Sequence, residues 1–138
     1  MSRFRSRPVS VNTPTVASVL VVDDDLVVGR SLCRALQALR SDFRVELATS
    51  GEAALEHLRT HPCDVIVTDL EMGRLSGSEL LETLARDYPE IVRIVHSSQK
   101  EALDSHEMRQ LVHGSFDKPA RPSYIADLIE RTLPAKVK

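Results

Sequence analysis

The chain has 138 residues, a formal net charge of −2 and 42% hydrophobic residues. These values predict one soluble globular domain with a hydrophobic core. They exclude a general nucleic-acid binder, which would be strongly basic, and no apolar run approaches the roughly 20 residues of a membrane-spanning helix.

The two ends of the chain differ in composition from the middle. Residues 1–18 contain arginines and prolines but no acidic residue, and no continuous apolar stretch follows the basic start as a secretory signal would require. We therefore predict a disordered basic tail over 1–18, a folded domain over 19–134 and a short tail over 135–138. Cys33 and Cys63 form no C-x-x-C pair, which favours buried thiols in a cytoplasmic protein.

The first part of the folded domain alternates apolar runs with amphipathic segments. The wholly apolar run 19–22 is typical of a strand buried on both faces. An apolar stripe predicts a helix over 26–40, and alternating side chains predict a half-buried strand over 43–47. Ser50 is then expected to cap a helix over 51–59.

The second part continues this alternation. A buried strand over 65–67 precedes a helix that we expect to run from a cap at Ser78 to about Arg86. Later segments alternate in the same way, with strands predicted over 91–95 and 115–117 and helices over 101–112 and 122–133. Five strand–helix repeats predict an α/β fold, a doubly wound five-stranded parallel sheet of the flavodoxin-like (βα)5 type with strand order 2-1-3-4-5.

Polar side chains follow four of the predicted strands at their carboxyl ends. Asp23 and Asp24 follow the first strand, and Asp69 follows the third. Ser97 follows the fourth strand and Lys118 the fifth. Because the active crevice of an open α/β sheet lies beyond the carboxyl ends of its strands, we expect these groups to converge on one small area.

Three close carboxylates repel one another unless a cation balances them. Mg²⁺ prefers oxygen ligands and retains several waters, so the sequence predicts Mg²⁺ as the cofactor of this area. We expect Asp24 and Asp69 to be direct ligands and Asp23 to act through water. The backbone carbonyl of Glu71 is a further candidate ligand.

Phosphoryl transfer is the chemistry that such a group of residues suits. The Asp69 carboxylate can attack phosphorus and form an acyl phosphate. Mg²⁺ and Lys118 would neutralise charge on the transferring oxygens. The Ser97 hydroxyl could then hydrogen-bond a phosphoryl oxygen, a contact that would bias a conformational equilibrium.

From about Ser18 to Leu133 the chain resembles the response-regulator receiver domain, the chemotaxis-regulator-like family of two-component systems. The motifs that carry the resemblance occur in the family's order, namely Val21-Val22-Asp23-Asp24, Val67-Thr68-Asp69, Met72, Gly77, Ser97-Ser98 and Lys118-Pro119. The resemblance implies that Asp69 is the phospho-acceptor and that Asp23 and Asp24 are the metal-binding pair. It further implies that Ser97 is the switch hydroxyl and that Lys118 binds the phosphoryl group. The proline that follows this lysine, Pro119, is typically cis in the family.

The resemblance also implies partners. A sensor histidine kinase or phosphotransfer protein would supply the phosphoryl group, and hydrolysis would remove it. A downstream protein would read the face formed by the fourth helix, the fifth strand and the fifth helix. The chain would thus be a self-modifying phospho-acceptor rather than a turnover enzyme. We expect no direct contact with nucleic acid or membrane, and the sequence leaves a weak homodimer open.

Three positions depart from the family pattern. Gly73 stands where the family usually has proline after Met72, and Ser115 stands where it usually has an aromatic residue. We expect the neighbouring Phe116 to point into the core. His96 precedes the switch hydroxyl, where an apolar residue is common. The residues that phosphoryl transfer needs are present, but these departures predict an unusual readout of the phosphorylated state.

Several alternatives compete with this interpretation. A phosphatase of the haloacid-dehalogenase type would need a second aspartate at the position of Glu71, and a flavodoxin-type binding module would need a phosphate loop where Asp23 to Asp25 stand. A pseudo-receiver without phosphoryl chemistry, or a receiver cut from a longer regulator with an output domain, also fits. Asp25 is interpreted as a helix cap. Four histidines without metal spacing are interpreted as structural or exposed, namely His57, His61, His106 and His113.

Overall fold

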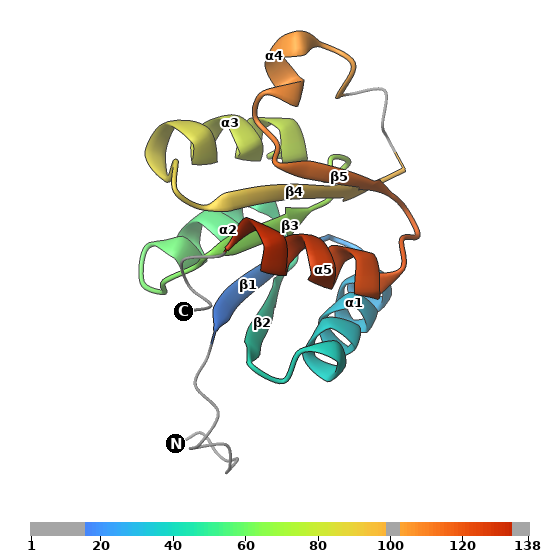
Figure 1. Cartoon of the computed structure of the whole chain (residues 1–138). Coiled ribbons are helices and arrows are strands. Elements are labelled where there is room, and N and C mark those ends of the chain that lie inside the picture. The colour runs from blue at the N-terminus through green and yellow to red at the C-terminus, as the bar shows by residue number, and fades with distance from the viewer. Residues whose placement is uncertain (1–15, 99–102, 134–138) are drawn as a thin grey trace.

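The computed structural model describes residues 16–98 and 103–133, and a five-stranded sheet forms the centre of this part of the chain (Figure 1). The strands are β1 (Ala17–Val22), β2 (Phe43–Ala48), β3 (Val65–Thr68), β4 (Val92–Ser97) and β5 (Gly114–Asp117). All neighbouring strands are parallel, and their order is β2-β1-β3-β4-β5. The predicted fold class and strand order are confirmed, although β1 begins two residues earlier than expected.

Helices cover both faces of the sheet. They are α1 (Leu26–Leu39), α2 (Gly51–Leu58), α3 (Gly77–Asp87), α4 (His106–Arg109) and α5 (Pro122–Thr132). One face buries Leu36 of α1 and Ile125 of α5, and the other buries Ala54 of α2 and Leu80 of α3. Within the described residues, no helix has the length and apolar character needed to cross a membrane.

The central strands are buried more completely than the edge strands. Every residue of β3 and β4 is buried, whereas the edge strand β5 has no fully buried residue. Strands buried on both faces are typical of parallel sheets, which explains why the inner strands read as continuous apolar runs. In β5, Phe116 packs against the core as predicted, and Ser115 is exposed.

The helix starts agree with the sequence at two caps and differ at a third. Asp25 caps α1 and Ser50 caps α2, as predicted. The cap of α3 is Ser76 and not Ser78, so that prediction was wrong. The Ser76 side chain accepts from the Glu79 N–H while the Glu79 carboxylate accepts from the Ser76 N–H. This reciprocal capping box needs Glu three residues after the serine, a condition that Ser76 meets and Ser78 does not.

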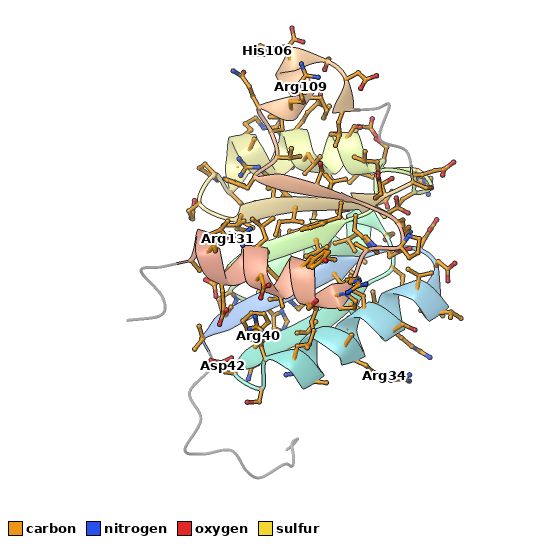
Figure 2. All side chains as sticks on the ribbon, turned by 45° about the vertical axis from the view of Figure 1, so that its right-hand side comes forward. Arg34, Arg40, Asp42, His106, Arg109 and Arg131 are labelled. Atoms are coloured by element: carbon orange, nitrogen blue, oxygen red, sulfur yellow. The ribbon has the colours of Figure 1, made fainter. Side chains whose placement is uncertain are left out.

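The predicted helix over 101–112 was too long. In the described part of this segment α4 is the one α-helix, a single turn that Ser105 caps. His106 and Arg109 lie on this turn at the outer end of the molecule, beyond the sheet (Figure 2). Residues 1–15, 99–102 and 134–138 lie outside the described residues. Most of the tail predicted over 1–18 and all of the tail predicted over 135–138 therefore fall outside them, whereas Ala17 and Ser18 belong to β1.

A surface ion-pair group joins α1 to α5 on one face. Arg40, which is labelled in Figure 2, follows the last turn of α1. Its Nη2 lies 2.6 Å from Asp127 Oδ1 and 3.2 Å from Glu130 Oε1 of α5. Because both carboxylates are half exposed, we assign this group a small share of the stability. It links the carboxyl end of α1 to the second half of α5.

Candidate functional site

The carboxyl ends of β1 and β3 bring two aspartates side by side. Val22 pairs with Thr68 in the parallel ladder, so that Asp23 and Asp69 follow at the same height. The Asp69 N–H donates to the Val22 carbonyl at 3.0 Å, which extends the ladder one residue beyond the strand. The predicted convergence of these two side chains therefore follows directly from strand register.

Lys118, which follows the edge strand β5, approaches the same two aspartates. Its N–H donates to the carbonyl of Ser97, the last residue of β4, at 3.1 Å. Its ammonium lies 2.8 Å from Asp23 Oδ2 and 2.9 Å from Asp69 Oδ2. Asp23 is only 3% exposed and Asp69 only 7%, so these charges interact largely out of water. The Lys118-Pro119 peptide bond is cis, in agreement with the family pattern.

Asp24 completes an acidic cluster at the mouth of this site. One carboxylate oxygen from each of Asp23, Asp24 and Asp69 lies within 4.8 Å of the others, and Asp24 is exposed. Within the described residues this is the one group of three with such spacing. Three carboxylates against one ammonium leave two negative charges unbalanced. A hard divalent cation with oxygen ligands fits both the charge and the donor atoms.

The pKa values of the central pair favour the charged forms. Burial opposes ionisation of Asp69, but hydrogen bonds from Lys118, the Glu71 N–H and the Ser97 hydroxyl outweigh it and lower the pKa of this carboxyl. Burial also opposes the charge of Lys118, yet its hydrogen bonds to Asp23 and Asp69 raise the pKa of the ammonium. Asp69 is therefore an ionised carboxylate beside a cation at neutral pH.

Main-chain contacts hold both carboxylates in place. Asp23 Oδ1 accepts from the Asp25 N–H at 2.9 Å, and Asp69 Oδ1 accepts from the Glu71 N–H at 3.2 Å. The Glu71 side chain is exposed, and its carbonyl as a metal ligand stays a prediction. Each central aspartate thus uses one oxygen for the backbone and presents the other to Lys118.

Gly77 lies against the backbone of Asp69, a contact that the sequence motif alone did not explain. A Cβ at this position would stand 2.1 Å from the Asp69 carbonyl oxygen and 2.5 Å from Leu70 Cα. The first turn of α3 therefore packs directly on the backbone that carries Asp69. By contrast, a Cβ on Gly73 would meet nothing within 4 Å.

His96 contacts the segment that carries Lys118. It lies near the end of β4, is 6% exposed, and its Nε2 accepts from the Ala120 N–H at 3.3 Å. Burial, followed by the nearby Lys118 charge, lowers the pKa of this imidazole. A neutral His96 is consistent with its role as acceptor. Histidine at this position, where the family commonly has an apolar residue, thus accepts a hydrogen bond from the turn after β5.

These observations define a class of protein, an open α/β domain with an ionised aspartate, a paired lysine and an acidic cluster at one end of a parallel sheet. Comparison with known proteins supports the same class. Residues 19–130 match the family model of the response regulator receiver domain. The chain belongs to this family of two-component signalling modules, which confirms the predicted resemblance and favours it over the phosphatase and flavodoxin alternatives.

Individual relatives support the same assignment. The chain is 28% identical over 116 residues to the heme response regulator HssR of Staphylococcus saprophyticus, covering 84% of this chain and 50% of that protein. It is 32% identical over 122 residues to the hydrogenase transcriptional regulatory protein HoxA of Cupriavidus necator, covering 87% of this chain and 25% of the relative. The chain therefore spans half or less of the length of these two relatives.

A solved structure shows the same fold. A response regulator receiver domain protein from Clostridium thermocellum superposes with a TM-score of 0.76 at 21% identity, covering 88% of this chain and 97% of that one. At this identity the likeness concerns the fold alone. The family is a signalling module and not a classical enzyme class, as predicted.

Proposed function

We propose that this chain is a phospho-acceptor receiver in a phosphorelay and that Asp69 carries the phosphoryl group. The observation that carries the proposal is the Lys118 ammonium, held 2.9 Å from Asp69 Oδ2 in a largely buried site. A cation in this place can stabilise negative charge on a transferring phosphoryl group. Asp69 is ionised, fixed by main-chain contacts and placed beside the exposed Asp24.

The proposed reaction joins Asp69 to phosphorus. A carboxylate oxygen of Asp69 attacks the phosphorus of a phosphohistidine, an O–P bond forms, and the P–N bond breaks. The electron pair of that bond stays on the imidazole, which takes up a proton. Lys118 stays within reach of the new phosphoryl oxygens and offsets their charge. Water later takes the phosphoryl group from the acyl phosphate, which breaks the O–P bond, releases inorganic phosphate and restores the Asp69 carboxylate.

We propose that Mg²⁺ is the cofactor of this reaction. Asp24 and Asp69 would hold it directly, with Asp23 through water and Glu71 through its carbonyl. When bound, Mg²⁺ would balance the excess negative charge of the cluster and of the incoming phosphoryl oxygens. The support for this assignment is the all-oxygen donor set and its uncompensated charge.

Ser97 is the proposed switch residue. Its hydroxyl hydrogen-bonds the Asp69 carboxylate and lowers its pKa. A phosphoryl group on Asp69 would offer this hydroxyl a new acceptor beyond the carboxylate. Moving the hydroxyl to that acceptor would favour one conformation of the end of β4. In the family, an aromatic side chain on the fifth strand usually follows this movement. Here the exposed Ser115 of β5 stands at that position.

The partners follow from the family. A sensor histidine kinase or a phosphotransfer protein would donate the phosphoryl group, and a protein partner would read the α4-β5-α5 face. Two alternatives are kept, a pseudo-receiver that acts only as an interaction surface and a receiver joined to an output domain. The ionised Asp69–Lys118 pair supports an active receiver over a pseudo-receiver.

The proposal is tested by incubating the protein with a small phosphodonor and Mg²⁺ and measuring its intact mass. We expect the gain of one labile phosphoryl group in the wild-type chain and none in Asp69→Asn. A matched control is Asp25→Asn, since asparagine caps helices as well as aspartate does. Uptake in Asp69→Asn equal to that of the wild type would refute the assignment of the acceptor.

A further inference from the structure

His113, the residue before the edge strand β5, contacts both main-chain groups of Arg93 on β4. Its backbone N–H donates to the Arg93 carbonyl at 2.7 Å, and its ring Nδ1 accepts from the Arg93 N–H at 2.9 Å. In a continued parallel ladder, that N–H would donate to the carbonyl of Leu111. The Leu111 carbonyl accepts from Arg93 Nε at 2.7 Å, so a side chain that can gain a proton takes the place of a fixed carbonyl.

Arg93 fastens the segment between α4 and β5, residues 110–113. Three hydrogen bonds tie this segment to Arg93, two through His113 and one through Leu111. Apolar contacts add little, because α4 has no buried residue and Leu111 and Val112 are only partly buried. A segment with few buried apolar contacts opens locally at a low cost in free energy. The bonds to Arg93 therefore decide how firmly residues 110–113 stay on the sheet.

Charged groups approach His113 from two sides. Arg93 lies on β4, while Asp104 and Arg109 line a cavity of about 280 Å³ together with His113. Arg109 Nη1 donates to the Asp104 carbonyl at 2.6 Å, which holds that guanidinium beside the start of α4. On the α5 side, the first residue of β5 lies against the uncharged Leu128. Burial first, and then the Arg93 charge, lower the pKa of His113 against a smaller opposing contribution from the Arg93 backbone.

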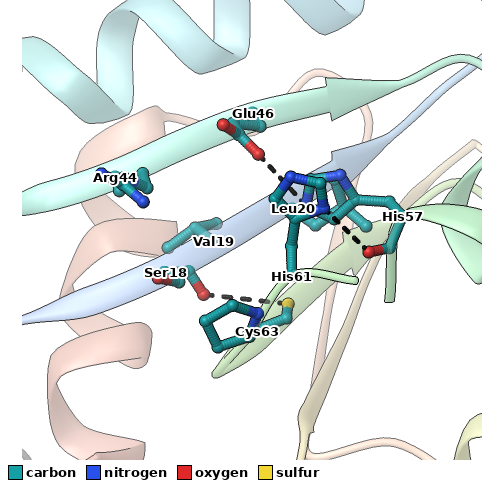
Figure 3. A pocket seen from close by; sticks show the side chains of 9 residues that line it. Ser18, Val19, Leu20, Arg44, Glu46, His57, His61 and Cys63 are labelled. Carbon is teal, nitrogen blue, oxygen red and sulfur yellow. Dashed lines mark hydrogen bonds and ion pairs between the residues drawn. The ribbon is translucent and has the colours of Figure 1, made fainter. Parts of the chain in front are cut away.

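His57, near the end of α2, has a different partner (Figure 3). Its Nε2 lies 3.1 Å from Glu46 Oε1, so a proton on that ring would complete an ion pair. A proton on His113 Nδ1 would face the Arg93 N–H, which is also a donor, and would place a cation beside the Arg93 guanidinium. Protonation of His113 thus breaks one hydrogen bond to β4 and adds a repulsion between like charges.

We propose that His113 is a pH-sensitive latch, which holds residues 110–113 on Arg93 while its ring is neutral and releases them when the ring takes up a proton. In the unfolded chain this ring has the ordinary histidine pKa of about 6.5. Because the folded pKa lies below that value, the latch contributes its full stabilisation above about pH 6.5 and loses it as the pH falls through the folded pKa. The latch therefore changes the α4-β5-α5 face without any phosphoryl group on Asp69.

The test is amide hydrogen exchange of the unphosphorylated whole chain, followed by NMR from about pH 7.5 to about pH 5, a range that spans histidine titration. The intrinsic rate at each pH is divided by the measured rate to give a protection factor. We expect the protection factor of the Arg93 N–H to fall by about fivefold at the acid end, as the loss of one ordinary hydrogen bond gives. The Val92 N–H, which donates to the Asp64 carbonyl at 2.9 Å, is the internal reference and should change little. An equal fall at Val92 would mean opening of the whole sheet and would overturn the local latch.

His113→Asn isolates the effect of the proton, because its amide oxygen can accept from the Arg93 N–H but does not titrate. Protection of the Arg93 N–H should then stay at its neutral-pH value throughout. His113→Leu lacks an acceptor and should show weakened protection at every pH. His106→Gln is the matched control, since His106 is exposed on α4, and it should keep the pH dependence of the wild type. The proposal is overturned if protection in the wild type does not depend on pH, or if His113→Asn loses it as the wild type does.

Discussion

Lys118 and Arg93 are two cations at opposite ends of the β4–β5 pair, and they differ in what surrounds them. Lys118 follows β5 and meets the carboxylates of Asp23 and Asp69. Arg93, the second residue of β4, is 8% exposed. Its guanidinium donates to main-chain carbonyls, at 2.7 Å to Leu111, 2.9 Å to Ile91 and 3.3 Å to Pro89.

The difference separates a reactive charge from a structural one. Burial lowers the pKa of Arg93, and no carboxylate is among the causes. For Lys118, hydrogen bonds to two carboxylates outweigh burial and raise the pKa. Carboxylates can change partners when a metal ion or a phosphoryl group arrives, whereas carbonyls of the backbone stay where the fold puts them. We infer that Lys118 responds to signalling and that Arg93 holds the turn before β5.

The largest expected effect comes from removing the structural cation. Arg93→Leu would leave the Leu111, Ile91 and Pro89 carbonyls without this donor, and we expect a loss of about 2–3 kcal/mol in the free energy of unfolding. Urea denaturation measures it. Arg93→Lys keeps the charge but loses the fork geometry, and should fall between the wild type and Arg93→Leu. A loss below about 0.5 kcal/mol in Arg93→Leu would contradict the structural role.

The next effect concerns the backbone under the acceptor. Gly77→Ala forces a Cβ into the Asp69 carbonyl, and overpacking of this kind costs typically about 1–3 kcal/mol. Chemical denaturation should show that loss, together with slower phosphoryl uptake because Asp69 moves. Gly73→Ala is the matched control, since a Cβ there meets nothing and no described glycine has positive φ. Equal stability of the two variants would show that the loop yields at Gly77.

The sequence predicted the carboxyl end of the sheet well and the amino end poorly. Asp23, Asp69 and Lys118 could be placed because parallel strands end on one side, whatever the details of packing. Arg93 could not, since the carbonyls that it binds belong to the turn after α4 and to the residues before β4. The sequence distance between these parts hides the contact.

A smaller effect is expected at His96. His96→Leu would deprive the Ala120 N–H of its acceptor and should lower the free energy of unfolding by about 1 kcal/mol. Gln offers an oxygen at a similar reach, so His96→Gln should recover most of that loss. Phosphoryl uptake should follow the same order, because this turn carries Lys118. Identical uptake rates in all three proteins would remove His96 from the positioning of Lys118.

The smallest effect on stability is expected at Asp24. Without divalent ions, Asp24→Asn removes a carboxylate that repels Asp23 and Asp69, and exposed charges of this kind contribute at most about 1 kcal/mol. We therefore expect a slight rise in the melting temperature without Mg²⁺ and a smaller gain when Mg²⁺ is added. Calorimetry with and without the ion measures both. An unchanged gain from Mg²⁺ would remove Asp24 from the metal site.

Two other features were difficult to predict from the sequence, namely the cap of α3 and the length of α4. Ser76 and Ser78 both precede the apolar face of α3, and the choice between them required the spacing to Glu79. The helix predicted over 101–112 has a poor apolar stripe, and α4 has no fully buried residue. With so little burial to stabilise it, the helix is a single turn. Its length could not be predicted from helix propensity alone.

Chemical trapping can show which residue carries the phosphoryl group. After phosphorylation, borohydride reduces an aspartyl phosphate to homoserine, and peptide mass spectrometry identifies the modified position. We expect homoserine at position 69 in the wild type, and much less of it in Lys118→Met because the charge that stabilises transfer is missing. Homoserine at position 23 or 24, or an equal yield in Lys118→Met, would refute Asp69 as the acceptor or Lys118 as its partner in the transfer.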